Sequence, residues 1–578
     1  MPALNPIRLH ASPKSVFVAG HKPVRTFTEE EFETAKKEGK SASLLEENRP
    51  NVFSMKLANI MPQEQIEIEL RYTELLVPTE GVYEVVYPTV VGPRYPSGDK
   101  ESKEGKTVNA PYLHEGEKSG SALHISARIA AGVPIAELTC TSHQITPEWQ
   151  NASVANLTLD DADPFQGNRD FILHYRLAGD QINSGLILYA GEGENFFLYM
   201  AQPPKRVVTE DIPPREYIFV VDVSGSMSGF PLNASKVLLQ DLIGKLRPTD
   251  LFNVILFSGD STALSEKPLP AIQENIDRAI SLIDQQRGSG GTELLPAIKQ
   301  AMSLPRAPGV SRSIVLVTDG YISGEQETFE HIRKNLSECN VFAFGIGSSV
   351  NRYLIEGVAK AGMGEPFIVE DQTKAAAEAA RFREYIQSPV LTDIKIRSIG
   401  FDTYDVFPVQ VPDLLAGRPV IIFGKWRGPA TGTIELTGKT GRGDYSTTFD
   451  VTGAQPDSAN VALRYLWARS RIDELSDYGA MSLTDDRVKQ ITALGLKYNL
   501  LTPFTSFIAV REKVVNPDGT SEDVNQPLPL PLGVSDLAVG SEPELMWLIA
   551  WLAAIAIFLV MRRRWGDARQ FGWNIISK

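Results

Sequence analysis

The most informative segment of the chain is Tyr217-Ile218-Phe219-Val220-Val221-Asp222-Val223-Ser224-Gly225-Ser226. Its apolar run predicts a buried strand, and the strand ends on one carboxylate and two hydroxyls in a turn that contains a glycine. Because Asp222, Ser224 and Ser226 alternate along the turn, their oxygen atoms can converge on one point. Oxygen ligands of this kind suit a hard divalent cation such as Mg²⁺, which prefers octahedral coordination and usually keeps some water.

Two further segments fit the same site. Gly290-Gly291-Thr292 precedes a helical pattern and can supply a third hydroxyl, and Val315-Leu316-Val317-Thr318-Asp319-Gly320 ends another apolar strand on a second carboxylate. Ligands bind at the carboxyl ends of the strands in an open α/β sheet, and Asp222 and Asp319 both fall at such ends. The sequence therefore predicts one metal site, formed by the side chains of Asp222, Ser224, Ser226, Thr292 and Asp319.

Around these segments, apolar strands alternate with amphipathic helices from Arg215 onward. This alternation predicts a doubly wound, mostly parallel sheet that is covered by helices on both faces. The expected strands are 216–222, 251–257, 313–318, 341–346 and 366–369. The expected helices are 231–246, 271–286, 293–303, 325–337, 351–361 and 373–386.

Length, charge and cysteine content narrow the class of protein. A chain of 578 residues is too long for a single core, so several domains are expected. The net charge of −14 would repel a phosphate backbone, so nucleic acid is not an expected partner. Cys140 and Cys339 are the only cysteines, and we expect both to be buried apolar residues rather than a disulfide or a thiolate metal site. The seven histidines include no pair at ligand spacing on a helix, which argues against a zinc enzyme.

The sequence on either side of the α/β region shows the alternation of half-buried strands in a β-sandwich. A charged helix that stops at Gly39 is expected near the start, and two helices at 462–472 and 485–496 near the end. We expect seven parts: a domain at 1–90, a β-rich region at 91–212, the α/β domain at 213–390, a β-rich region with two helices at 391–515, a Pro-rich linker at 516–544, a transmembrane helix at 545–561 and a short basic cytoplasmic tail at 562–578.

The expected membrane span is Leu545–Met561, which contains 17 residues without a charge. As a helix it would be about 26 Å long, at the short end of what crosses a bilayer. Arg562-Arg563-Arg564 follows it, and arginines beside a span favour the cytoplasmic side. We therefore expect a single-pass cell-membrane protein with the bulk of the chain extracytoplasmic, either periplasmic or at the cell surface. The alternative is that 545–561 forms a buried core helix.

Export would require a signal, and residues 1–8 lack the long apolar segment of a secretory signal. Two explanations remain open. In the one that we favour, the natural start lies upstream of Met1. In the other, the protein is tail-anchored with its bulk in the cytoplasm, which would place the three arginines on the wrong side of the membrane.

The pattern Asp222-x-Ser224-x-Ser226, taken with Thr292 and Asp319, resembles the metal-ion-dependent adhesion site of von Willebrand factor type A domains. Order, spacing and strand context all match, and the resemblance covers residues 215–390. It implies a Rossmann-like α/β fold, here flanked by β-sandwich regions. It also implies that the five side chains surround Mg²⁺ or Mn²⁺, either directly or through water.

A second resemblance lies upstream. The segments 35–46, Pro50-Asn51-Val52-Phe53 and Ile60-Met61-Pro62 resemble the second half of a VIT domain, the N-terminal module of inter-alpha-trypsin inhibitor heavy chains and their bacterial relatives. The first half of that module is not recognisable in residues 1–27, so it is expected to be missing or altered. Leu466-Trp467-Ala468-Arg469 and 500–507 resemble the same family after its A domain. The combination looks like a bacterial, membrane-anchored member of this group.

The predicted function follows from the metal site. If the five side chains and water leave one coordination position open, that position can accept a carboxylate from an Asp or Glu of a partner protein. A divalent ion at the contact offsets the cost of burying that carboxylate and makes recognition depend on metal. We therefore expect a membrane-anchored, adhesion-type protein without catalytic residues or an organic cofactor.

Other functions stay open. One is an envelope scaffold or assembly factor whose metal site holds a fixed intramolecular ligand. A metal-dependent hydrolase is less favoured, because it needs a base beside the metal-bound water, and Glu293 in the motif segments better fits the start of a helix. The simplest interpretation is that Asp222 and Asp319 only cap helices or accept backbone hydrogen bonds at strand ends.

Overall fold

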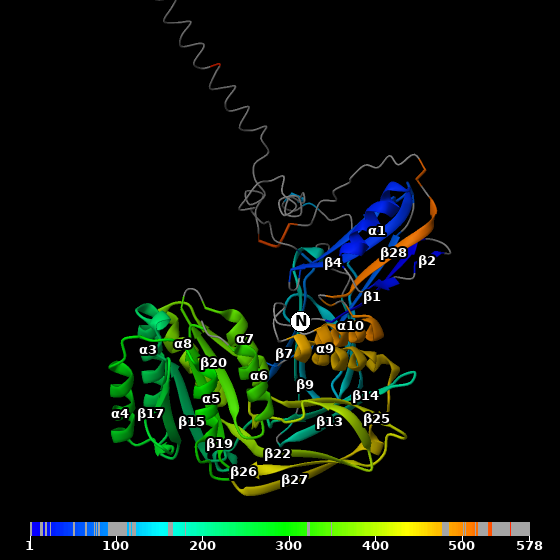
Figure 1. The fold of residues 1–578 in the computed structure, drawn as a ribbon. Helices are drawn as coiled ribbons and strands as arrows, with labels where there is room; N and C mark the ends of the chain where they lie inside the picture. The colour runs from blue at the N-terminus through cyan, green and yellow to red at the C-terminus, as the bar shows by residue number, and fades with distance from the viewer. Residues whose placement is uncertain are drawn as a thin grey trace, which may run out of the picture.

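The computed structural model describes residues 3–90 with short gaps, and residues 123–533 except 160–165, 178, 180, 321–323, 348–349, 477–484, 501, 503, 515 and 518–529. It also describes a few separate residues at 112–117 and Ile555. Figure 1 shows a helix-covered α/β domain beside a β-rich part, and a small N-terminal sheet with helix α1 beyond the helices α9 and α10.

The α/β domain (residues 215–386) is built on a sheet of seven strands in the order β17-β16-β15-β19-β20-β21, with β18 also pairing with β16. Five strands run parallel, and the short β17 and β18 run antiparallel to β16. The strands are β15 (Arg215–Asp222), β16 (Leu251–Phe257), β17 (Ser261–Ala263), β18 (Leu269–Pro270), β19 (Ser311–Thr318), β20 (Asn340–Ile346) and β21 (Pro366–Val369).

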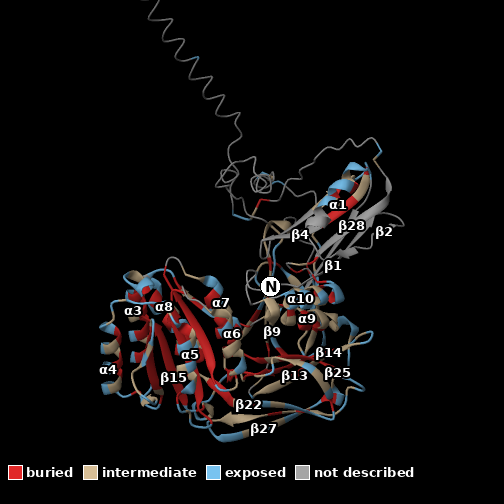
Figure 2. Ribbon diagram, viewed as in Figure 1, coloured by how far each residue is buried: buried red, intermediate tan, exposed pale blue. Residues whose placement is uncertain are grey.

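Helices cover both faces of this sheet. One face packs against α3 (Phe230–Gly244), α4 (Gln273–Asp284) and α8 (Ala375–Ile386), and the other against α5 (Leu294–Ser303), α6 (Glu325–Lys334) and α7 (Arg352–Ala361). Every residue of β15 and β19 is therefore buried, as Figure 2 shows for the central strands. The expected doubly wound, mostly parallel sheet is confirmed, and so are its helices and strands, although α6 ends at Lys334 instead of 337.

A β-sandwich brings together strands from both sides of the α/β domain. One sheet has the order β13-β14-β25-β23 and the other β24-β22-β26-β27, and apolar side chains such as Tyr199 and Leu436 fill the space between them. The α/β domain lies between β14 and β25 in the sequence, yet these two strands pair with each other. The expected boundaries at 212 and 391 therefore divide a single sandwich. The strands are β13 (Asn183–Ala190), β14 (Asn195–Gln202), β22 (Pro389–Ile399), β23 (Asp402–Phe407), β24 (Leu414–Leu415), β25 (Val420–Arg427), β26 (Thr433–Thr440) and β27 (Gly443–Asp450).

Two three-stranded sheets precede the sandwich, with the orders β7-β12-β9 and β10-β11-β8. Leu157, Phe171 and Leu173 belong to the apolar cluster that joins them. Apart from two short 3-10 turns, the regular structure in the described part of 91–212 consists of strands. The strands of the two small sheets, of which β7 lies before residue 91, are β7 (Val82–Tyr87), β8 (Ser126–Ala130), β9 (Ile135–Cys140), β10 (Ile145–Asn151), β11 (Val154–Leu159) and β12 (Phe171–Leu177).

The last helices and the last strand return to earlier parts of the chain. Helices α9 (Ala462–Ser476) and α10 (Asp485–Tyr498) pack on the outer face of β13, β14 and β25. Strand β28 (Ser506–Val514) then enters the N-terminal sheet of order β3-β28-β4-β5, with Phe507 paired to Leu45. The expected region 391–515 therefore supplies a strand to the expected domain 1–90.

The N-terminal part contains strands where no VIT half was recognised. Strand β1 pairs with β6 and β2, and α1 ends shortly before Gly39, whose φ of +71° suits the expected glycine stop. Its elements are β1 (Ala3–Ala11), β2 (Ser15–Phe17), β3 (Gly20–Lys22), α1 (Arg25–Lys37), β4 (Lys40–Arg49), β5 (Val52–Ala58) and β6 (Ile66–Thr73).

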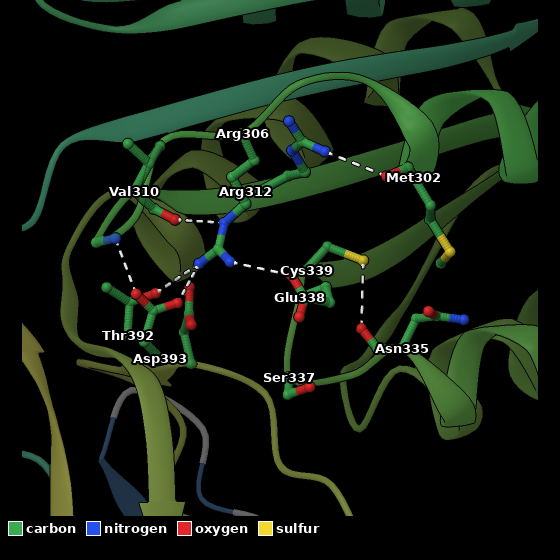
Figure 3. A network of polar contacts seen from close by, with 12 residues as sticks. Met302, Arg306, Val310, Arg312, Asn335, Ser337, Glu338, Cys339, Thr392 and Asp393 are labelled. Carbon is green, nitrogen blue, oxygen red and sulfur yellow. Dashed lines mark hydrogen bonds and ion pairs between the residues drawn. The ribbon is translucent and has the colours of Figure 1, made fainter.

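Polar contacts fix the α/β domain to strand β22 of the sandwich (Figure 3). Arg306 Nη2 lies 2.6 Å from Asp393 Oδ1, and Asp393 Oδ2 accepts a hydrogen bond from the Gly309 N–H at 2.8 Å. Arg306 Nη1 also lies 3.3 Å from Glu338 Oε2. One guanidinium group therefore links the loop before β19, the segment before β20 and the first part of β22.

The two ends of the α/β domain meet at this same edge of its sheet. Arg215, the first residue of β15, donates a hydrogen bond of 2.7 Å to the carbonyl of Gln387, which directly follows α8. The same guanidinium forms an ion pair of 2.7 Å with the buried Asp250. Nearby, Ser311 at the start of β19 donates to Asp413 of the sandwich at 2.6 Å. The amino ends of the parallel strands are thus tied down, and their carboxyl ends lie at the opposite edge.

Several expectations fall on parts of the chain that the structure describes incompletely. No helix among the described residues has the length and apolarity needed to span a membrane. Within the expected span at 545–561 only Ile555 is described, and most of 516–544 and all of 562–578 lie outside the described residues. Both cysteines are free thiols; Cys339 is buried, as expected, but Cys140 is only half-buried.

Candidate metal site

Asp222 ends β15 at the carboxyl edge of the sheet and is fully buried. Parallel pairing sets Val221 opposite Val317, so the next residues, Asp222 and Thr318, are neighbours on adjacent strands. One carboxylate oxygen, Oδ1, accepts a hydrogen bond of 2.9 Å from the Ser224 N–H. The other, Oδ2, accepts one of 2.6 Å from the Thr318 hydroxyl. The strand pairing therefore fixes the direction in which this carboxylate points.

The two predicted serines connect Asp222 to the second predicted carboxylate. They flank Gly225 in a short 3-10 turn, and their hydroxyl oxygens lie 3.1 Å apart. Ser226 also donates a hydrogen bond of 3.1 Å to Asp319 Oδ1. Ser224 and Asp319 are buried, whereas Ser226 is exposed. Four of the five predicted residues thus form one connected group that opens to solvent at Ser226.

The loop that carries Thr292 is attached to the same turn. The Gly225 N–H donates to the Gly290 carbonyl at 3.1 Å, and the Ser289 N–H donates to the Val223 carbonyl at 2.9 Å. Gly288, with a φ of +78°, comes so close that a Cβ atom there would lie 3.0 Å from the backbone of Ser228. Thr292 is half-buried at the end of this loop. The loop before Thr292 is therefore attached to the turn, but among the described residues the Thr292 hydroxyl is not part of the hydrogen-bonded group of the other four.

Two residues that the sequence pattern did not predict as part of the site, Thr318 and Asn351, form hydrogen bonds to the backbone of the turn after Asp319. Besides binding Asp222, Thr318 Oγ1 accepts a hydrogen bond of 3.0 Å from the Gly320 N–H. Asn351 donates from its backbone to the Asp319 carbonyl at 3.0 Å and from its side chain to the Gly320 carbonyl at 2.8 Å. Each residue has a sequence feature that could have predicted its role. Thr318 directly precedes the predicted ligand Asp319, and Asn351 is of a residue type that is common at the start of a helix.

The electrostatics of the site favour a bound cation. Burial raises the pKa of Asp222; the hydrogen bonds from Ser224 and Thr318 lower it, and the negative charge of Asp319 raises it further. Two carboxylates held near each other away from water repel, and a divalent ion between them would remove that repulsion. Within the described residues, no group of three or more His, Cys, Asp or Glu side chains is arranged so that it could hold a metal ion. The donor set is therefore two carboxylates plus neutral hydroxyls, which fits Mg²⁺ or Mn²⁺ and lacks the nitrogen and sulfur ligands typical of zinc.

The simplest interpretation of Asp222 accounts for only part of this geometry. Asp222 does accept a backbone hydrogen bond at its strand end, as that interpretation requires. It gives no reason for Ser226 to reach Asp319 from a separate loop, or for two buried acidic side chains to lie close enough for the charge of Asp319 to raise the pKa of Asp222. A shared cation would account for both features.

Comparison with known families agrees with the α/β fold. Residues 215–366 match the von Willebrand factor type A domain, and residues 24–72 match the vault protein inter-alpha-trypsin (VIT) domain. The chain therefore contains a region that matches each of these two domains. Homologues of the chain include inter-alpha-trypsin inhibitor heavy chain H4 and several von Willebrand factor A domain-containing proteins.

Individual relatives are similar over most of the chain. The von Willebrand factor A domain-containing protein 5A of Rattus norvegicus is 23% identical over 527 residues, which cover 85% of this chain and 63% of that protein. Inter-alpha-trypsin inhibitor heavy chain H4 of Homo sapiens is 25% identical over 517 residues, covering 83% of this chain and 53% of that protein. The chain thus spans less than two thirds of either relative. A solved von Willebrand factor type A structure from Catenulispora acidiphila is 15% identical and covers 59% of this chain and 95% of its own, with a TM-score of 0.39.

Proposed function

We propose that this chain binds a partner protein through a divalent cation, Mg²⁺ or Mn²⁺, held by Asp222, Ser224, Ser226, Thr292 and Asp319. The observation that carries the proposal is the group of hydrogen bonds in which Ser226, on the turn after β15, reaches Asp319 after β19. Through it, oxygen atoms from separate loops meet at one partly open edge of the sheet. The ion would supply a positive charge to which an Asp or Glu carboxylate of the partner binds.

The carboxylates and the hydroxyls of the site would have different roles in binding the cation. Asp222 and Asp319 would provide the negative charge that retains the cation, and the serine hydroxyls would complete its oxygen shell without adding further charge. Because hydroxyl ligands are neutral, they leave the cation more electrophilic toward the partner's acid than additional carboxylate ligands would. Ser226 lies at the exposed side of the group, so the partner would approach from there.

The experiment is a selection of random peptides on the immobilised full chain, once with Mg²⁺ and once with EDTA. We expect the peptides recovered with Mg²⁺ to be enriched in Asp and Glu, and to be lost with EDTA. The Asp222→Ala chain should recover none of them, whereas Asp260→Ala, a change of an exposed acid in the loop after β16, should recover the same set. Binding that survives both chelation and Asp222→Ala would overturn the proposal.

We also propose that residues 545–561 anchor the chain in the cell membrane, with residues 1–544 extracytoplasmic. The support is the uncharged run itself and the three arginines that follow it. Protease added to intact cells or spheroplasts should then remove the α/β domain and leave only a small membrane-bound fragment. Full protection of the chain until the membrane is dissolved would contradict this orientation, and release by sodium carbonate would contradict the anchor.

A further inference from the structure

We propose that Thr318, which is not one of the five expected ligands, is a positioning residue whose single hydroxyl orients both carboxylates of the metal site. The inference rests on the proposed metal-binding function and deepens it. Thr318 is the last residue of β19 and is fully buried, so its hydroxyl exchanges no hydrogen bond with bulk water. It lies beside Asp222 on the neighbouring strand and directly before Asp319 in the chain.

The direction of its hydrogen bonds is determined by the partners. A hydroxyl has one proton to donate and can accept from other donors. The Gly320 N–H can only donate, so Thr318 Oγ1 accepts from it at 3.0 Å and directs its own proton to Asp222 Oδ2 at 2.6 Å. The carboxylate of Asp222 is thereby held from one side by Thr318 and from the other by the Ser224 N–H.

The same hydroxyl also acts on the second carboxylate through the backbone. Gly320 has a φ of +90°, and a Cβ atom there would lie 2.7 Å from Asn351 Cβ, so the turn after Asp319 admits little change. The bond from Gly320 to Thr318 closes this turn and so sets the direction of the Asp319 side chain. One oxygen atom therefore connects the two loops that must stay in register for both carboxylates to meet one ion.

This role predicts a specific effect on metal selectivity. Groups that orient metal ligands typically change affinity by about 10–100-fold when they are removed. Mg²⁺ requires near-ideal octahedral geometry, whereas Ca²⁺ accepts flexible arrangements of oxygen ligands. Loss of the orienting hydroxyl should therefore weaken Mg²⁺ binding more than Ca²⁺ binding. A purely structural role for Thr318 would weaken both to the same degree.

The test is calorimetric titration of the full chain with Mg²⁺ and with Ca²⁺. Thr318→Val keeps the shape and the branched Cβ but removes the hydroxyl, and we expect Mg²⁺ affinity to fall by about 10–100-fold. Thr318→Ser keeps the hydroxyl and should bind Mg²⁺ almost as the unchanged chain does. The matched control is Thr328→Val, because Thr328 is equally buried but donates its hydroxyl to the carbonyl of Gly324, which directly precedes α6. Its Mg²⁺ affinity should not change.

A second variant keeps the test valid if Thr318→Val does not fold, as judged by circular dichroism in EDTA. Thr318→Ala removes the hydroxyl without placing a methyl group against the Asp222 carboxylate, and it should show the same loss of Mg²⁺ over Ca²⁺. Equal Mg²⁺ binding by a folded Thr318→Val or Thr318→Ala chain and the unchanged chain would overturn this inference alone. Absence of Mg²⁺ and Mn²⁺ binding by the unchanged chain would overturn the proposed function and this inference together.

Discussion

Ser226 Oγ lies 3.1 Å from Asp319 Oδ1, although 93 residues separate the two along the chain. The contact joins the turn after β15 to the turn after β19 at the carboxyl edge of the sheet. Both loops are short continuations of buried strands, so the approach of the two side chains is set by the sheet itself. This is the arrangement expected of a site that is assembled before its ligand arrives.

The first prediction concerns the second carboxylate. Asp319→Asn keeps the size of the side chain but removes a negative charge, so Mg²⁺ affinity should fall by more than the 10–100-fold that is typical of a group that only orients a ligand. Titration calorimetry of the full chain measures this. Asp260→Asn serves as the control, because Asp260 is an exposed acid in the loop after β16. Similar Mg²⁺ affinities for the two variants would show that Asp319 is not a ligand.

The second prediction concerns a buried lysine in the sandwich. Lys425 Nζ lies 3.6 Å from the centre of the Trp467 ring and 3.0 Å from Glu194 Oε1, and its side chain is only 4% exposed. Lys425→Met would remove a buried charge from its ion pair and from the aromatic ring, which should cost about 2–4 kcal/mol. Native-state hydrogen exchange should report the loss as faster opening of α9 and α10.

The control for that change is Lys439→Met in β26. Lys439 Nζ lies 3.1 Å from Asp444, but both side chains are well exposed, so the change should stay within about 0.5 kcal/mol. If α9 and α10 exchange equally in the Lys425→Met, Lys439→Met and unchanged chains, Lys425 does not hold the helix pair on the sandwich.

The third prediction is a pH dependence at Glu194. Burial alone would raise the pKa of Glu194, but hydrogen bonds from Lys425, Lys497 and Tyr498 outweigh it and lower the pKa to about 2. A pKa below that of the unfolded chain means that the stabilisation is complete above about pH 4.5 and is lost as the pH falls toward 2. Since the side chain is 24% exposed, solvent screening limits the effect to about 1–2 kcal/mol.

Glu194→Gln tests this dependence. The variant should unfold more readily than the unchanged chain at pH 7, and the difference should shrink as the pH falls from 4.5 to 2. Urea unfolding followed by tryptophan fluorescence at each pH measures it. A difference that is constant over this range would mean that the charge of Glu194 makes no contribution.

The fourth prediction concerns strand β28. Its central position between β3 and β4 means that Ala509→Pro would remove a backbone donor from the interior of the N-terminal sheet, where proline is not tolerated. Hydrogen exchange of β4 and β5 should become faster, while β15 and β19 should be unaffected. Ala509→Ser retains the donor and should leave β4 protected. Unchanged exchange of β4 in the proline variant would contradict the pairing.

The elements of the α/β domain were predictable because its strands are continuous apolar runs and its helices repeat apolar residues with helical spacing. Asp222 and Asp319 stood out because each ends such a run. Thr318 did not, since a threonine at a strand end has several ordinary explanations. What the local pattern could not reveal was pairing across long distances, such as β14 with β25 and β28 with β4. The burial of Lys425 was not predictable either, because a lysine in a strand normally indicates an exposed face.

The hydrogen bond from Arg215 to the Gln387 carbonyl has a mechanical consequence. The chain enters and leaves the α/β domain at one edge of the sheet, and the candidate metal site lies at the other. A pulling force that a partner applied at the metal edge would therefore act along the parallel strands. It would be shared by the two chain connections at Arg215 and Gln387, which lie next to each other. Neither the first strand nor the last helix of the domain could then unfold separately, so the force would have to disrupt the whole sheet at once.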